Sequence, residues 1–219
     1  MNLEQPPADG AVDQQLAGEF PGLRLRWTAV EGGAAGPTPP ALRRRLDEVN
    51  RRFRGPQAIA LRTRPVPRAY RVFFRQVGLD PDVDRTPAEQ AAVARLVTGD
   101  VCSGERVADA LALAIIETGV AVLALDDARL DGELTLRGAR AGETLQVGEH
   151  AHDVPPGRLV LADRGGPVAV LFGRLSERYA PGRETARTRL VAIQVPGVPE
   201  VHVEEALWLA ASALSADGD

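Results

Sequence analysis

One short segment constrains the fold more than any other, because it reads as a helix, a tight turn and two strands in direct succession. Residues 107–119 are apolar on nearly every face, which predicts a helix that is buried on most of its sides. Gly119 is expected to end this helix as a left-handed C-cap. The apolar run 120–125 predicts a covered strand, and residues 133–137 alternate polar with apolar side chains, as a strand with one covered face does. We expect the rest of the chain to be built around this unit.

Two acidic residues of this unit need an explanation. Asp109 lies inside the apolar helix, and Asp126 follows the apolar strand. A buried carboxylate is costly unless it is paired or hydrogen-bonded. A structural interpretation pairs Asp109 with an arginine and has Asp126 accept backbone N–H groups in the turn. The alternative interpretation places one or both at the rim of a ligand pocket, and both are therefore candidate ligand-binding residues. The composition favours the structural interpretation.

The length and charge of the chain limit what it can be. Its 219 residues suffice for one substantial domain with an appendage. We expect residues 1–66 to supply an N-terminal strand and an Arg-rich helix packed on a main domain of residues 67–219. A formal net charge of -4 argues against binding nucleic acid by bulk positive charge, and no DNA partner is expected.

Cysteine content and hydropathy suggest where the protein works. Cys102 is the single cysteine, so the chain can form neither an intramolecular disulfide nor a zinc site of several cysteines. No apolar run approaches the length of a membrane span, so no membrane partner is expected. These features predict a cytoplasmic protein.

The other predicted elements do not alternate regularly between strand and helix, which favours an α+β fold over a doubly wound parallel sheet. Residues 1–12 are expected to form a loose arm, and residues 41–53 a helix. Exposed arginines of that helix, Arg43, Arg44 and Arg51, are candidate RNA-binding residues or protein-interaction residues. A simple solvated helix face is the favoured alternative, because no aromatic residue is interleaved for stacking on bases.

Motifs that would identify a cofactor or a catalytic centre are missing. The chain has no glycine-rich phosphate-binding motif, no HExxH and no GxSxG, so neither a cofactor nor a metal is expected. His150 and His152 are two residues apart, but a turn location favours solvent exposure. Residues 176–188 concentrate hydroxyl groups and charges between two apolar strands. Glu177 and Thr185 of this segment are candidate ligand-binding residues, with a solvated loop tip as the equal alternative.

Several short strings, in order, resemble a known family, the B3/B4 editing module of the beta subunit of bacterial phenylalanyl-tRNA synthetase. The strings are YRVFFRQVGLDP at 70–81, VAD at 107–109, ALD at 124–126, LDGELTLRGARAGE at 130–143, LVLAD at 159–163 and AVLFG at 169–173. The resemblance covers about two-thirds of the chain. It implies a layered β-sandwich-like core flanked by helices, with a pocket between the layers. In the synthetase, that pocket hydrolyses phenylalanine tRNA wrongly charged with tyrosine.

Apolar groups replace much of the family's polar pocket in this chain. Where the family has an asparagine and a histidine, this chain has Ala112 and Leu123, and Leu175 or Glu177 takes the place of the glutamate that recognises tyrosine. A framework of charged residues persists, namely Asp109, Asp126, Arg137, Glu143 and Asp163. Losing polar pocket groups removes polar discrimination between ligands.

Two functions follow from this resemblance. The first is a freestanding editing-domain homologue that binds tRNA or aminoacyl-tRNA. If it is an enzyme, it hydrolyses mischarged aminoacyl-tRNA, and the sequence identifies no catalytic residue for this reaction. The alternative is a non-catalytic binding module with an apolar pocket for an amino acid or another small hydrophobic ligand. A pocket lined by Asp109, Asp126 and Glu177 would favour chemistry, and a pocket lined by aliphatic side chains would favour binding alone.

Overall fold

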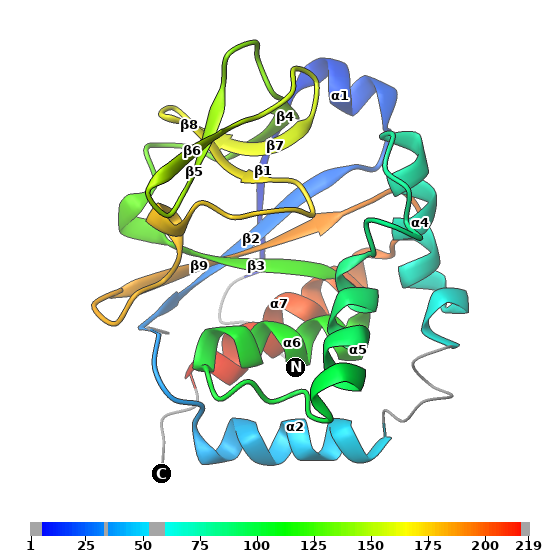
Figure 1. Ribbon diagram of the computed structural model, residues 1–219, viewed down its shortest axis with the longest axis vertical. Helices are drawn as coiled ribbons and strands as arrows, with labels where there is room; N and C mark the ends of the chain where they lie inside the picture. The colour runs from blue at the N-terminus through cyan, green and yellow to red at the C-terminus, as the bar shows by residue number, and fades with distance from the viewer. Residues whose placement is uncertain (1–5, 33–34, 53–59, 216–219) are drawn as a thin grey trace.

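The protein has an α+β fold, seen in a computed structural model that describes residues 6–32, 35–52 and 60–215 (Figure 1). Its strands are β1 (Ala8–Val12), β2 (Arg24–Glu31), β3 (Ala121–Asp126), β4 (Thr135–Gly138), β5 (Thr144–Val147), β6 (His150–Asp153), β7 (Leu159–Asp163), β8 (Gly166–Val170) and β9 (Arg187–Gln194). Its α-helices are α1 (Gln14–Glu19), α2 (Pro40–Arg52), α4 (Pro65–Gln76), α5 (Pro87–Thr98), α6 (Arg106–Thr118) and α7 (Glu200–Ser215). Short 3₁₀ helices are η1 (Leu61–Thr63), η2 (Asp127–Arg129) and η3 (Glu177–Tyr179).

Seven strands form one curled sheet in the order β3-β9-β2-β1-β4-β7-β8, and β5 with β6 forms a separate hairpin. Neighbouring strands are antiparallel except β1 and β4, which are parallel. The β1 strand therefore joins two antiparallel halves. The expectation that residues 1–12 form a loose arm was wrong for residues 8–12. These residues pair with β2 on one side and β4 on the other, and this pairing satisfies their backbone polar groups.

Strands from residues before 66 thus lie in the middle of the sheet. β2 pairs along its whole length with β9, from Arg24 opposite Gln194 to Glu31 opposite Arg187. The predicted boundary between residues 66 and 67 stays a prediction, but the N-terminal segment contributes to the same sheet as the C-terminal half of the chain.

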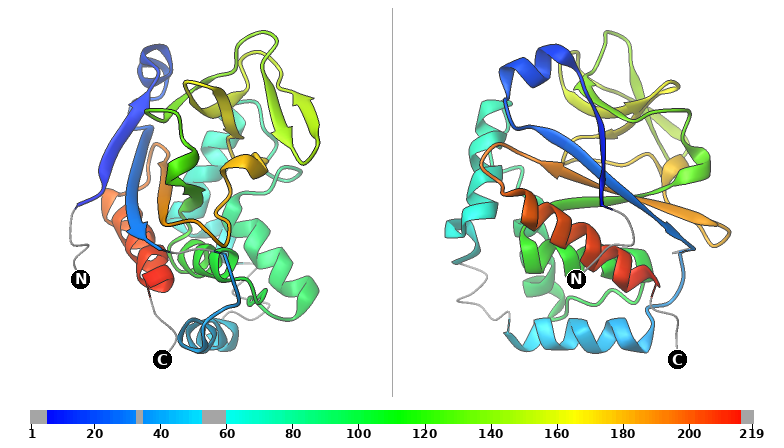
Figure 2. Two further views of the ribbon diagram at one scale, coloured as in Figure 1. Left: turned by 90° about the vertical axis from the view of Figure 1, so that its left-hand side faces the viewer. Right: turned by 180° about the vertical axis from the view of Figure 1, so that it is seen from behind.

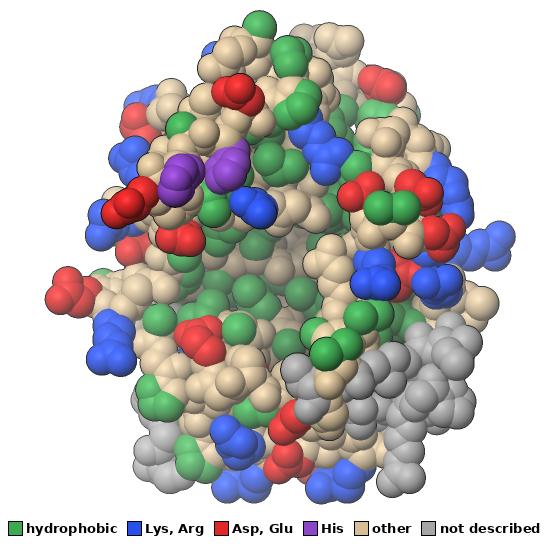
Figure 3. Space-filling model, in the orientation of Figure 1, with side chains coloured by type: hydrophobic (Ala, Val, Ile, Leu, Met, Phe, Trp, Pro, Cys, Tyr) green, Lys and Arg blue, Asp and Glu red, His purple; other side chains and the backbone are tan. Residues whose placement is uncertain are grey.

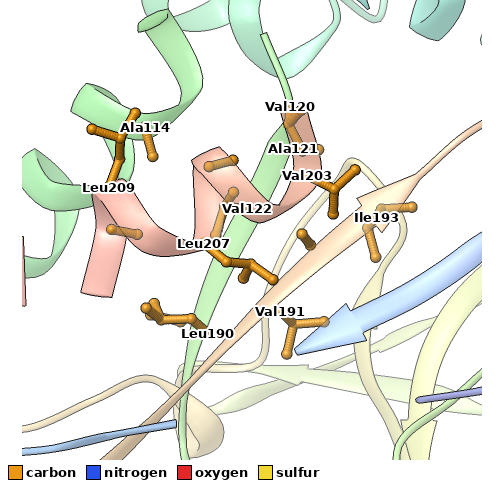
Figure 4. Close-up of a cluster of buried hydrophobic side chains, with 14 of the residues drawn as sticks. Ala114, Val120, Ala121, Val122, Leu190, Val191, Ile193, Val203, Leu207 and Leu209 are labelled. Carbon is orange, nitrogen blue, oxygen red and sulfur yellow. The ribbon is translucent and has the colours of Figure 1, made fainter. Parts of the chain in front are cut away.

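Helices α6 and α7 cover one face of the β2, β9 and β3 part of the sheet, and α2 lies against α6 on the side away from the sheet (Figures 1 and 2). The core between α7 and the sheet is aliphatic: Val203 and Leu207 of α7 lie against Val191 and Ile193 of β9 (Figure 4). Burying such side chains contributes roughly 1.5 to 3 kcal/mol each. This core fixes the positions of β3, β9 and α6.

Several local predictions are confirmed. The α6 helix ends at Gly119, whose φ of 79° is the left-handed conformation of a C-cap, and a Cβ atom there would lie 2.9 Å from the ring of Pro67. At the start of α5, the backbone N–H of Glu89 donates to the Thr86 hydroxyl, and the Glu89 carboxylate accepts the backbone N–H of Thr86. This reciprocal pair is a capping box.

Candidate binding pocket

A cavity of about 420 Å³ opens between α5, α6, β3 and the turn after β8. Figure 3 shows it as a recess with hydrophobic walls in one face of the molecule. Helix residues that line it are Pro87, Gln90, Ala91, Ala94, Ala108, Leu111, Ala112 and Ile115. Sheet and turn residues that line it are Ala121, Val122, Leu123, Ala169, Val170, Phe172, Gly173, Leu175 and Ile193. A concave apolar site of this size is typical of a small-molecule pocket.

The walls of this pocket are almost wholly apolar. Among the described residues that line it, Gln90 alone carries a polar side chain, and its amide nitrogen donates to the carbonyl of Arg85 at 2.8 Å. Alanines on both helices and both strands leave the space that larger side chains would fill. The pocket therefore suits an apolar group and supplies no carboxylate, imidazole or hydroxyl to act as an acid or a base.

Phe172 forms part of the wall in an unusual backbone conformation. Its φ is 57°, the left-handed region that a non-glycine residue seldom adopts. The turn is closed by Gly173, whose N–H donates to the carbonyl of Val170 at 2.9 Å. The Phe172 ring packs on α4, with ring centroids 5.7 Å from Tyr70 and 4.8 Å from Phe74. This aromatic packing holds the turn in place, and such strained positions often accompany a ligand site.

Tyr70 fixes the strands behind the pocket. Its hydroxyl donates to the carbonyl of Ile193 and accepts the N–H of Ala121 at 3.0 Å. Ala121 and Ile193 are opposite each other in the β3–β9 pair, and both line the pocket. Burial raises the pKa of the Tyr70 hydroxyl well above its ordinary value, so the group stays protonated.

Asp109 is fully buried, but it holds a loop and does not line the pocket. Its carboxylate accepts hydrogen bonds from the Thr38 hydroxyl, from the Cys102 thiol at 3.1 Å, from the N–H and hydroxyl of Ser103 at 2.6 and 2.7 Å, and from the N–H of Gly104 at 3.1 Å. Burial alone would raise the pKa of Asp109, yet the hydrogen bonds from Thr38, Ser103 and Cys102 outweigh it and lower that pKa. The expected arginine partner is not found among the described residues, because hydroxyl and backbone donors fill its place.

The fold brings Thr185 next to Asp126 at the end of β3, a pairing that neither the strand pattern nor the loop pattern indicates. The Thr185 hydroxyl donates to the Asp126 carboxylate at 2.9 Å and accepts the N–H of Gly182 at 2.9 Å. Asp126 also accepts the N–H of Ala128 at 3.1 Å, as expected for a turn carboxylate. The pair joins the end of β3 to the loop before β9 and lies outside the pocket lining.

The remaining site candidates lie apart from the pocket lining. Glu177, in η3, is exposed. Arg43, Arg44 and Arg51 are exposed on α2, which buries Leu42, Leu46 and Val49 on its other side. The structure places the three arginines on a helix that contributes no residue to the pocket. Residue 53 of the predicted helix lies outside the described residues.

The other framework residues stabilise turns. Arg137 makes a two-pronged ion pair with Glu143, with N···O distances of 2.8 and 2.6 Å, and this contact lowers the pKa of Glu143. The Asp163 carboxylate accepts the N–H groups of Asp131 at 2.9 Å and Gly165 at 2.8 Å. These contacts order the β4, β5 and β7 region, and none of the three residues lines the pocket.

The two histidines lie on a strand and not in the expected turn. His150 and His152 are both exposed in β6, where they pair opposite Val147 and Leu145. Across the described part of the chain, no cluster of three or more His, Cys, Asp or Glu side chains could hold a metal ion. Nor does any helix in those ranges have the length and apolar character needed to cross a membrane.

The sequence resemblance matches Ala112 and Leu123, and either Leu175 or Glu177, to polar pocket residues of the editing module. Ala112 of α6, Leu123 of β3 and Leu175 after β8 all line the cavity, whereas Glu177 does not. The sequence resemblance is the only source for this correspondence, since neither the models of known protein families nor the curated proteins give a match to the chain.

Proposed function

We propose that this protein is a freestanding relative of the B3/B4 editing module whose pocket has become an apolar binding site for the side chain of an amino acid, either free or esterified to tRNA. The observation that carries the proposal is the shared location of Ala112, Leu123 and Leu175 in one cavity. The resemblance matches Ala112 and Leu123 to polar residues of the editing pocket and offers Leu175 as one of two candidates for a third, and the three residues come from separate parts of the chain. Their convergence supports a common site.

The architecture supports the same proposal. The β4, β7 and β8 strands, together with the β5–β6 hairpin, lie on one side of the β2, β9 and β3 strands, and α6 and α7 lie on the other (Figure 1). A layered, sandwich-like core flanked by helices is what the resemblance to the module implies.

The lining favours binding over hydrolysis. Ester hydrolysis by this pocket would depend on a water molecule positioned by backbone groups, because the lining supplies no side-chain base. The binding function needs only apolar surface and a matching shape. We therefore propose ligand binding as the main function of the pocket and deacylation of aminoacyl-tRNA as a second, catalytic function.

A thermal-shift screen tests the proposal. A ligand that binds only the folded state at ten times its Kd adds about 1.4 kcal/mol, which raises Tm by roughly 3 to 5 °C in a chain of this size. We expect phenylalanine, leucine or isoleucine, as amino acid amides, to raise Tm more than serine or aspartate amides do. An equal response to apolar and polar amides would contradict the proposal.

The catalytic form has its own test. Purified protein is incubated with a panel of aminoacyl-tRNAs, and release of the amino acid is compared with release in buffer. Hydrolysis of any ester faster than in buffer supports deacylation, and hydrolysis at the buffer rate throughout limits the protein to binding.

A further inference from the structure

We propose that a groove on the outer face of α4 is a binding site for phosphate groups. Its cavity, about 340 Å³ in volume, is lined by Arg62, Thr63, Arg68, Arg71, Val72 and Arg75. Three of these arginines lie on α4 at positions i, i+3 and i+7, so they share one face of the helix over about 10 Å of its length. Guanidinium groups bind phosphate oxygens through two parallel hydrogen bonds, which makes arginine the preferred residue for this ligand.

Two of the four arginines are held in fixed positions. Arg71 is largely buried and contacts Glu89 and Asp82 at 2.7 Å each, and its Nη1 also donates to the carbonyl of Pro81 at 3.2 Å. Arg62 contacts the same Glu89 carboxylate at 3.1 Å. Glu89 is itself buried within the α5 capping box. These ion pairs anchor Arg71 and Arg62 beside the groove.

The other two arginines are available to a ligand. Arg68 and Arg75 are exposed, and among the described residues no carboxylate lies within 4.0 Å of either guanidinium group. The groove therefore holds four guanidinium groups against the carboxylates of Asp82 and Glu89. An excess of positive charge in a concave site attracts anions. The helical spacing fits an extended ligand with more than one phosphate group.

The first turn of α5 contributes to the surroundings of both the groove and the apolar pocket. Glu89 holds the groove arginines, and its neighbour Gln90 lines the pocket. The buried face of α4 carries Tyr70 and Phe74, which pack on Phe172 in the pocket wall. A ligand with an apolar end and a phosphate chain could occupy both sites, and this last step alone rests on the proposed function.

A single RNA strand and a small polyphosphate offer the same phosphate chemistry, so the test uses both. Binding of a short fluorescein-labelled single-stranded RNA is measured by fluorescence anisotropy, and binding of sodium tripolyphosphate by calorimetry. The groove variant is R68A/R75A. The matched control is R164A/R183A, which removes the same charge from two exposed arginines elsewhere.

We expect R68A/R75A to weaken binding of at least one probe by about tenfold and R164A/R183A to weaken it by less than about twofold. If the probe is RNA, the slope of log K against log salt should become shallower by about 1.4, because two phosphate contacts to a single strand are lost. Loss of RNA binding identifies a nucleic acid strand, and loss of tripolyphosphate binding alone identifies a small polyphosphate. The proposal is overturned if neither probe binds the native protein or if the control variant loses as much affinity as the groove variant.

Failure of the groove and failure of the pocket are distinguishable. Ala112→Phe fills the apolar pocket but leaves all six groove residues in place. We expect it to abolish the response to amino acid amides and to leave tripolyphosphate or RNA binding unchanged. If this variant loses both the response to amino acid amides and the binding of the phosphate probes, the probes bind in the pocket, which contradicts a separate phosphate site.

Discussion

The backbone N–H of Ala121 donates a 3.0 Å hydrogen bond to the hydroxyl of Tyr70, although the two residues lie 51 positions apart. The same hydroxyl donates to Ile193, so one side chain of α4 holds both strands of the β3–β9 pair. Ala121 and Ile193 line the pocket, and Tyr70 also packs on Phe172. The shape of the pocket therefore depends on α4 as well as on the elements that line it.

Tyr70→Phe should destabilise the protein by about 1 to 3 kcal/mol, because it leaves a buried N–H and a buried carbonyl without their partner while conserving the ring. Urea unfolding followed by circular dichroism measures the loss. Affinity for a pocket ligand should fall as well, since the strands are no longer fixed at this point. An unchanged unfolding midpoint would show that the hydroxyl contributes nothing.

Asp109→Asn should cost about 1.5 to 3 kcal/mol, because a neutral amide replaces a carboxylate that accepts hydrogen bonds from five donor groups. The control is Asp84→Asn, an exposed carboxylate. Chemical unfolding at neutral pH should separate the two variants. Equal stability of both would contradict a structural role for Asp109.

The pH dependence of the same contact follows from the lowered pKa of Asp109. Its folded pKa lies below the ordinary value of 3.8, so the folded state binds the proton less tightly than the unfolded state. The carboxylate therefore contributes its stability above about pH 4, and the contribution is lost as the pH falls through the folded pKa. The difference in unfolding free energy between the native protein and Asp109→Asn should shrink on acidification. A difference that grows below pH 4 would mean that folding raises the pKa of Asp109 and does not lower it.

Thr185→Val tests the pair that joins β3 to the loop before β9. It removes the donor to Asp126 and the acceptor for Gly182, and should cost about 1 to 3 kcal/mol. Thr185→Ser keeps the hydroxyl and should restore most of the loss. A double-mutant cycle with Asp126→Ala should give a coupling energy of at least about 0.5 kcal/mol. If Thr185→Val instead leaves stability unchanged and weakens ligand binding, Thr185 is a ligand-binding residue.

Local structure could be predicted from the sequence, because local rules determine it. The apolar helix that ends at Gly119, the following strand β3 and the cap at Thr86 each depend on residues within a few positions of one another. Strand β1 could not be found in this way. It is short, and its partners Trp27 and Leu136 belong to strands whose pairing only the complete sheet establishes.

The site was harder to predict for the same reason. The apolar pocket depends on alanines from α5, α6, β3 and β8, whose small side chains leave one common space. No short sequence pattern indicates that these alanines face the same space in the fold. The left-handed conformation of Phe172 has no signal in the sequence, because the residue is not a glycine. The carboxylates attracted attention as buried charges, yet Asp109 accepts a hydrogen bond from Thr38, 71 positions away, which the sequence does not indicate. The resemblance alone pointed to Ala112 and Leu123 and to either Leu175 or Glu177, and of the last two Leu175 is the one that lines the pocket.

The affinity of phenylalanine amide for the native protein, for Ala112→Phe and for Ala151→Phe shows whether the apolar pocket is the ligand site. Ala112 lines the pocket and Ala151 is exposed on β6, so the two variants add the same ring inside and outside the site. Titration calorimetry should show binding to the native protein and to Ala151→Phe with affinities equal within about twofold, and a loss of at least about tenfold in Ala112→Phe, or 1.4 kcal/mol. Equal binding by all three proteins would place the ligand elsewhere and exclude the apolar pocket as its site.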